Sequence, residues 1–414
     1  VGRNADTGQS HGGAFTQSGG THTTAKLLVG STDSPFAGTY SLSGGTLTAG
    51  EEIISGFGSF SQTGGTHTVT GVTTIDGPKP GIAPLAQFLL FNGTYDAGAI
   101  VVGDAGRGRF FQNAGNVTTG SLFLGLKGGG EGAYALAGGT LSAVSIYTVA
   151  GSGTFMFSGG TLRPRSSGAI LFPSGNLNLI VQSGGANIDS NGLNPTINKP
   201  LLHDSVLGSL IDGGLTKSGA GTLTLNADNT YNGDTQITGG TLIINAAHTS
   251  AVYAQTGTTL GGVGTLSGGA RLYAGAQLAP GGAADSIGTL RLGPSQLDVG
   301  SALVIDIANA TSFDKLTATS FFQLFGDLDV NLLNGYVPPV GTTFQIATMT
   351  LGLFEGAFGN ASSGFVTDDG YAYRVDYDNG ITLTRVVPEP TTLTSAVLLA
   401  GALLRRRSGV FRTS

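Results

Sequence analysis

The chain has 414 residues, of which 72 are glycine and none is cysteine or tryptophan. The absence of cysteine excludes disulfides, thiolate catalysis, iron–sulfur clusters and cysteine-ligated zinc. With 19 basic and 25 acidic side chains the formal net charge is −6, which argues against a nucleic-acid-binding protein.

Six ungapped copies of one glycine-rich pattern run through the first half of the chain. The pattern reads G-x-[FY]-x-[QLF]-x-x-G and is usually continued by Thr and then His or Leu. The copies start at Gly13, Gly38, Gly58, Gly108, Gly132 and Gly153, and a truncated copy starts at Gly93. Adjacent full copies that follow one another directly lie 20 to 25 residues apart. Glycine pairs supply the positive φ angles that sharp corners need.

Each copy predicts short strands separated by glycine corners. Because such a unit cannot bury its own apolar face, the copies must stack rung on rung. The sequence therefore predicts an all-β protein, a right-handed parallel β-helix (a solenoid) with rungs about 4.8 Å apart. A β-propeller is the main alternative, but its blades need roughly 40–50 residues each. We expect the solenoid over about residues 10–300, followed by a small β cap and a short apolar helix at the C-terminus.

The aromatic residues of the copies should form one ladder. They are Phe15, Tyr40, Phe60, Tyr95, Phe110, Tyr134 and Phe155. An internal stack is favoured over an external carbohydrate-binding stripe, because large apolar groups mostly lie inside.

Two copies place a histidine five residues after a glutamine, as Gln17–His22 and Gln62–His67. We expect each pair to be hydrogen-bonded inside the solenoid, although Gln112 is followed by Val117 instead. The two histidines should lie about two rungs, or roughly 10 Å, apart, which is too far for one zinc ion. No metal site and no cofactor is predicted.

The stretch from Leu215 to about Ile307 has a different character, with strict alternation in Thr222-Leu223-Thr224-Leu225. It resembles the autotransporter-associated β-strand repeat, also called the passenger-associated transport repeat, over about residues 213–246. The matching residues are Leu215, Lys217, Gly219, Gly221, Thr222, Leu223, Tyr231, Gly233, Thr235, Gly239, Gly240, Thr241 and Leu242. The resemblance implies a β-helical segment of a secreted surface protein and carries no catalytic residues.

These changes of character predict four regions: glycine-rich solenoid repeats over 1–200, the β-strand repeat region over 201–307, a β cap over 308–385 and a sorting signal over 386–414. Within the cap region, acidic turns near Asp368 and Asp378 raise a calcium hypothesis. Asp-Gly and Asn-Gly are also strong hairpin signals, and the EF-hand pattern is absent. An antiparallel cap that closes the solenoid is the plainer interpretation.

The C-terminal segment combines three features in order: Val387-Pro388-Glu389-Pro390, an apolar run from Leu393 to Leu404, and Arg405-Arg406-Arg407. The apolar run is shorter than the roughly 20 residues of a free-standing membrane span. The order closely resembles the PEP-CTERM protein-sorting signal. That resemblance implies Pro388, Glu389 and Pro390 as the motif recognised by an exosortase-type membrane protease. It also implies export, transient anchoring in the inner membrane, and delivery to the cell surface or an extracellular matrix, with Arg405, Arg406 and Arg407 as the membrane stop.

No catalytic motif is evident, since GxSxG at a strand-to-helix elbow and the P-loop are both absent. We therefore expect a non-enzymatic, exported structural or adhesive protein, with extracellular polysaccharide as a possible surrounding partner and no nucleic acid. The alternative is a carbohydrate-binding or carbohydrate-cleaving β-helix. The chain begins Val1-Gly2-Arg3 without Met or an apolar leader. Either a leader has been removed or the sequence is a fragment, and we favour the fragment.

Overall fold

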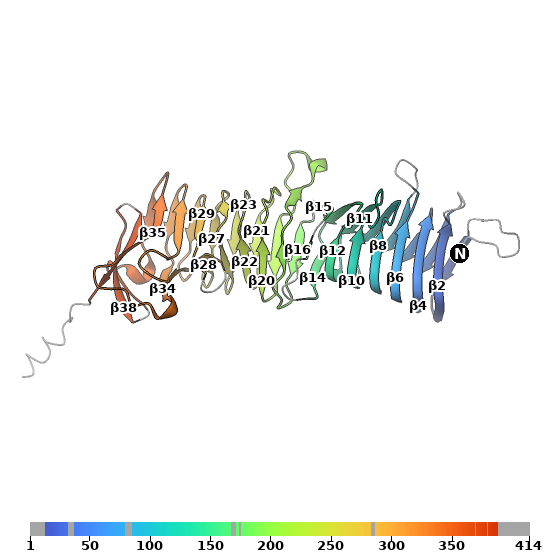
Figure 1. The fold of residues 1–414 in the computed structure, drawn as a ribbon, viewed down its shortest axis with the longest axis horizontal. Coiled ribbons are helices and arrows are strands. Elements are labelled where there is room, and N and C mark those ends of the chain that lie inside the picture. The colour runs from blue at the N-terminus through green and yellow to red at the C-terminus, as the bar shows by residue number, and fades with distance from the viewer. Residues whose placement is uncertain are drawn as a thin grey trace, which may run out of the picture.

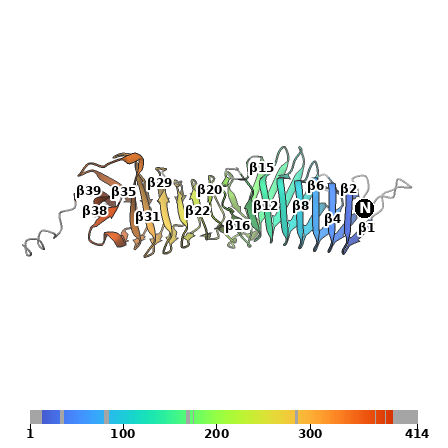
Figure 2. The ribbon, with the colours of Figure 1, turned by 90° about the horizontal axis from the view of Figure 1, so that it is seen from below.

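The computed structural model describes residues 13–31, 37–78, 85–166, 171–173, 175–282, 286–368, 370–378 and 380–387. These residues form an elongated rod whose strands run across the long axis (Figures 1 and 2). Successive turns of the chain stack along the axis, so that the first strands lie at one end and the last at the other. The prediction of a right-handed parallel β-solenoid is confirmed.

Two parallel sheets build the first part of the rod. Sheet I holds β1 (Gly13–Gln17), β3 (Gly38–Leu42), β5 (Ser59–Gln62), β7 (Ala86–Leu90), β9 (Arg107–Gln112), β11 (Glu131–Leu136), β13 (Ser152–Phe157), β15 (Asn176–Val181) and β18 (Leu201–His203). Sheet II starts with β2 (Thr21–Ser31), β4 (Thr46–Gly56), β6 (Thr66–Asp76), β8 (Thr94–Val102), β10 (Asn116–Leu124), β12 (Thr140–Tyr147), β14 (Thr161–Pro164) and β16 (Ala186–Asp189).

Sheet II runs on into the second part of the rod, where two further sheets replace sheet I. It continues with β19 (Leu215–Ser218), β21 (Thr235–Ile237), β24 (Val252–Ala254), β27 (Ala270–Leu272), β30 (Ser295–Leu297), β33 (Phe322–Leu324) and β36 (Phe354–Gly356). Sheet III holds β17 (Thr196–Ile197), β20 (Thr222–Leu225), β22 (Thr241–Ile244), β25 (Thr259–Gly262), β28 (Gln277–Pro280), β31 (Ala302–Ile307) and β34 (Asp327–Leu332).

Sheet IV ends in the antiparallel strands of the far end. Its parallel part is β23 (Ala247–His248), β26 (Thr265–Leu266), β29 (Thr289–Leu292), β32 (Lys315–Ala318) and β35 (Thr343–Met349). The strands β39 (Ile381–Val386), β38 (Tyr371–Asp376) and β37 (Phe365–Asp368) then follow with antiparallel pairing. The parallel stack runs on to β36, past the solenoid end that the sequence predicts at about residue 300, and the strands that pair only in antiparallel fashion begin at Phe365.

Helix is scarce in the described residues, where three 3₁₀ helices occur: η1 (Ser205–Leu207), η2 (Leu333–Gly335) and η3 (Gly359–Ala361). In these same ranges no helix has the length and apolar character needed to cross a membrane. The predicted apolar helix from Leu393 to Leu404 lies outside the described residues.

An aromatic ladder lies beside sheet I and is buried from Tyr40 onward, as predicted, but Phe15 at its N-terminal end is 43% exposed and one member differs. In-register pairing aligns Phe15, Tyr40, Phe60, Phe88, Phe110, Tyr134 and Phe155. Neighbouring ring centroids lie 4.6 to 5.4 Å apart, and most of the rings are stacked. Tyr95 is buried in sheet II, opposite His67, and does not belong to this ladder.

The predicted direct bonds from Gln17 to His22 and from Gln62 to His67 are wrong. The Gln62 amide donates to the carbonyl oxygens of Gly65 and Thr94, at 3.2 and 3.0 Å. Gln17 and His22 both contact the Tyr40 hydroxyl, at 2.6 and 3.0 Å, rather than each other. The glutamines therefore satisfy backbone carbonyls at the glycine corner and on the next rung, which also explains why Gln112 needs no histidine.

In the second part of the rod, a buried lysine donates hydrogen bonds to the backbone carbonyls of the glycine corners. Lys217 is fully buried, and its ammonium donates to the carbonyl oxygens of Ser218, Gly219 and Gly239 at 2.7 to 3.0 Å. Burial lowers the pKa of Lys217 to about 8. Its three N–H groups thus tie two successive glycine corners together.

Candidate functional site

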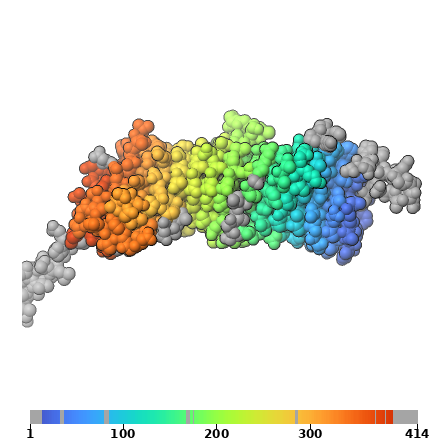
Figure 3. Space-filling model, viewed as in Figure 1, coloured from blue at the N-terminus to red at the C-terminus, as the bar shows by residue number. Residues whose placement is uncertain are grey.

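One loop stands out from the side of the rod. Residues 204–214, here called the knob loop, connect β18 at the end of sheet I to β19 in sheet II and contain η1. The loop is the yellow-green projection at the top of Figures 1 and 3. Three apolar side chains are exposed on it, with Val206 at 89%, Leu210 at 67% and Ile211 at 72% of their maximal exposure. Apolar groups at such exposure are typical of contact surfaces when they cluster.

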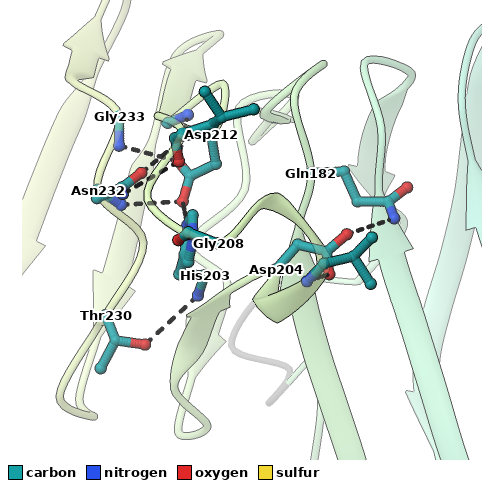
Figure 4. Close-up of polar contacts among 11 residues, drawn as sticks. Gln182, His203, Asp204, Gly208, Asp212, Thr230, Asn232 and Gly233 are labelled. Carbon is teal, nitrogen blue, oxygen red and sulfur yellow. Dashed lines mark hydrogen bonds and ion pairs between the residues drawn. The ribbon is translucent and has the colours of Figure 1, made fainter.

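A buried carboxylate fastens the end of the knob loop to the next turn of the solenoid. Asp212 Oδ1 accepts hydrogen bonds from the backbone N–H groups of Gly214 and Gly233, at 3.0 and 2.9 Å. Its Oδ2 accepts from the N–H of Asn232 at 2.9 Å. Asn232 returns the contact, because its side-chain oxygen accepts from the Asp212 N–H at 2.8 Å (Figure 4).

His203 completes this cluster from the last residue of β18. Its Nδ1 lies 2.7 Å from Asp212 Oδ2, and its Nε2 lies 3.1 Å from the carbonyl oxygen of Gly208 (Figure 4). Since a carboxylate and a carbonyl only accept, the two contacts are hydrogen bonds together only when both ring nitrogens donate, which is the protonated form of the imidazole. The hydrogen bond to Asp212 raises the pKa of His203 above its ordinary value, although partial desolvation opposes this.

The beginning of the knob loop is fastened to the preceding turn. Asp204 Oδ1 accepts from the Val206 N–H at 3.0 Å and so caps η1. Asp204 Oδ2 accepts from the side-chain amide of Gln182 at 2.8 Å. Two aspartates and one histidine therefore hold a loop with an apolar tip between adjacent turns of the solenoid.

The cluster contains two members of a Ser-His-Asp arrangement but not its working geometry. In such a triad the histidine binds the aspartate through Nδ1 and the serine hydroxyl through Nε2. At His203 the second position is occupied by the Gly208 carbonyl. Ser250 Oγ does lie 3.1 Å from His248 Nε2, but His248 is buried and its Nδ1 has no hydrogen-bond partner. Among the described residues, no histidine contacts both a serine and a carboxylate.

Most of the site residues predicted from the sequence lie outside the described residues. Pro388, Glu389 and Pro390, and likewise Arg405, Arg406 and Arg407, lie outside the described residues. In the turns of the calcium hypothesis, Asp368 accepts from the Val330 N–H at 2.6 Å, and Asp376 accepts from the N–H of Asp378 at 3.1 Å. Over the described ranges, no three His, Asp or Glu side chains gather as a metal site would require.

Comparison with known proteins places the repeat and identifies two relatives. The passenger-associated transport repeat model matches residues 215–244, which span β19 to β22. Two proteins of Serratia marcescens, both named extracellular serine protease, are 38% and 35% identical to this chain over 162 residues. Each match covers 37% of this chain and 15% of the relative, so the chain spans only a small part of these relatives.

The comparisons confirm one prediction and correct another. The predicted transport repeat is present, and the chain carries an autotransporter passenger-like β-helix repeat. The prediction that the protein is not an enzyme is contradicted, because both relatives are named as proteases. That prediction rested on missing local motifs, but triad residues meet in space and can lie far apart in sequence. The His203–Asp212 pair is not predictable from the sequence, because its spacing matches no short motif.

Proposed function

We propose that this chain is the stem of an exported, passenger-type protein and that the solenoid presents the knob loop outside the cell. The observation that carries the proposal is the transport repeat, which lies within one continuous stack of turns. A parallel solenoid of this kind suits a stem, because each turn pairs its backbone with both neighbours along the axis. The exposed apolar tip of the knob loop gives the stem a contact point for a structural or adhesive role.

Fractionation of the native host tests this proposal. Antibodies against the solenoid should detect the chain in the cell-surface fraction or the medium. A soluble cytoplasmic pool that holds nearly all of the protein would refute it.

We further propose that the tail from about Val387 is a sorting device. An arginine at the centre of a membrane span costs about 2.5–3.5 kcal/mol to insert. Three consecutive arginines after the apolar run would therefore stop export and leave Pro388-Glu389-Pro390 at the outer face of the inner membrane. An exosortase-type membrane protease could then cut there and release the protein toward the extracellular polysaccharide.

Mass spectrometry of the exported protein checks the sorting proposal. In a host that carries an exosortase, the mature protein should lack Arg405, Arg406 and Arg407. Replacing Pro388, Glu389 and Pro390 together by alanine should keep the uncut form in the membrane. An exported protein that ends at Ser414 would contradict the proposal.

The names of the two relatives favour a second candidate function, proteolysis by the whole protein. A fluorophosphonate probe, which reacts with activated serines, should then label the exported protein, and casein cleavage should be inhibited by the same reagent. The variant Ser250→Ala is the informative control, since Ser250 is the described serine that contacts a histidine. Label retained in that variant would place the nucleophile elsewhere, and no label on either protein would count against this candidate.

A further inference from the structure

A shallow groove lies on the outer face of sheet II in the second part of the rod. It has a volume of about 310 Å³ and is lined by side chains that include Tyr253, Arg271, Gln296, Phe321 and Gln323. Four successive strands, β24, β27, β30 and β33, contribute its floor. The groove is remote in the chain from the knob loop, and nothing in the stem role requires it.

The strand register places one polar or aromatic side chain on every rung of this face. In-register pairing aligns Gln236, Tyr253, Arg271, Gln296, Gln323 and Glu355 in a single file. Their neighbours along each strand, such as Val252 and Ala254, are buried, so the file points outward. With rungs about 4.8 Å apart, the file repeats at close to the distance that one sugar unit adds to an extended glycan.

The groove is held in shape before any ligand arrives. Asp298 Oδ2 accepts from Nε and Nη2 of Arg271, both at 3.2 Å, and its Oδ1 accepts from the Gln296 amide at 2.7 Å. The Arg271 guanidinium also lies over the Tyr273 ring, 5.0 Å from its centroid. The Gln323 amide donates to Glu355 at 3.0 Å. Fixed donors lose less entropy on binding than free side chains do.

We propose that this groove binds a neutral polysaccharide that runs along the solenoid axis, with about one sugar unit per turn. The side-chain amides donate to and accept from sugar hydroxyls, and the guanidinium donates to them. Half-buried Tyr253 and exposed Phe321 offer apolar surface to the C–H faces of pyranose rings. Because Asp298 neutralises Arg271 and Glu355 adds a negative charge, the file favours an uncharged chain over an acidic one. The proposal rests on the exported location proposed above, where such polymers are found.

Affinity electrophoresis of the full chain tests this proposal. Native gels would contain dextran, laminarin or galactomannan as neutral probes, and alginate as the acidic probe. At least one neutral probe should retard the protein, and Arg271→Ala and Tyr253→Ala should each weaken that binding by about tenfold or more. The matched control is Arg163→Ala, because Arg163 on β14 also pairs with an aspartate, Asp189, at 2.6 Å on the same sheet but outside the groove. Binding by this control should equal that of the unchanged protein.

Three results would overturn the proposal that the groove binds a polysaccharide. These are no retardation by any neutral probe, equal loss in the Arg163→Ala control, or preferential retardation by alginate. Circular dichroism of each variant should match that of the unchanged protein, and Gln323→Ala provides a third test in case Arg271→Ala unfolds. Localisation distinguishes the two proposals. If the protein is exported but binds no glycan, the proposal of an exported stem stands and only the proposal of a glycan-binding groove is rejected.

Discussion

Replacing Glu52 with glutamine should stabilise the protein by several kcal/mol at pH 8 and by much less at pH 5. Glu52 is fully buried on β4, where its Oε2 accepts from the hydroxyls of Thr73 and Tyr95 at 3.1 and 3.3 Å. Its Oε1 has no hydrogen-bond partner and lies 3.8 Å from His67 Nε2. Burial raises the pKa of Glu52 from 4.5 to about 8 and lowers that of His67 from 6.5 to about 3.

The sign of the pH dependence follows from these two values. The stabilisation from protonated Glu52 is fully present below about pH 4.5 and is lost as the pH rises through about 8. Over that range the loss is on the order of 4 kcal/mol, because each pH unit is worth about 1.4 kcal/mol. For His67 the sense is opposite, since its contribution is present above pH 6.5 and is lost as the pH falls toward about 3.

Urea unfolding followed by circular dichroism at pH 5 and pH 8 measures this effect. The stability gain of Glu52→Gln over the unchanged protein should grow by several kcal/mol between the two values. The half-exposed neighbour Glu51, which pairs with Lys26 at 3.0 Å, provides the control Glu51→Gln, with little change at either pH. Parallel stability curves for Glu52→Gln and the unchanged protein would show that Glu52 is ionised in the folded state.

Replacing Asp212 with alanine should release the knob loop and cost about 3–5 kcal/mol of stability. The substitution removes the acceptor for three backbone N–H groups and leaves the charged ring of His203 without its carboxylate. In the unchanged protein, the contribution of charged His203 should be present below its ordinary pKa of 6.5 and be lost as the pH rises through its raised value.

Hydrogen exchange of the amides of Gly214, Asn232 and Gly233 gives the direct measurement. All three should lose protection in Asp212→Ala, together with a fall in the urea midpoint. The control is Asp228→Ala, since Asp228 is exposed and its carboxylate accepts one backbone bond, from Ala247 at 2.8 Å. Unchanged protection in Asp212→Ala would mean that the loop is held by other contacts.

The repeats made the solenoid predictable because stacking is the way such units bury their apolar faces. One rung departs from the pattern, because Ala86 replaces the glycine that starts the other copies. As a result Phe88 was missed, and Tyr95 was assigned to its place in the ladder. In the structure Gly93 is the corner glycine, with φ of 94°. Tyr95 follows this corner on β8, where it pairs in register with His67 on β6 of the preceding turn.

The knob loop could not be predicted because its contacts join different turns. Asp212 binds backbone N–H groups some twenty residues further along the chain, and Asp204 binds Gln182 of the preceding turn. Such contacts depend on how the turns are offset, which composition and spacing do not reveal. The same holds for Lys217, whose sequence position marks the repeat but whose three carbonyl partners appear only once the corners are stacked.

The central claim, that the solenoid is an exported stem with the knob loop outside, has one direct test. A recognition sequence for a site-specific protease would be inserted between Ser209 and Leu210, at the exposed tip of the loop. The purified protease cannot cross a membrane, so it reaches the loop on intact cells only if the loop is outside. We expect the same extent of cleavage on intact and lysed cells, whereas cleavage that occurs only after lysis would contradict the claim.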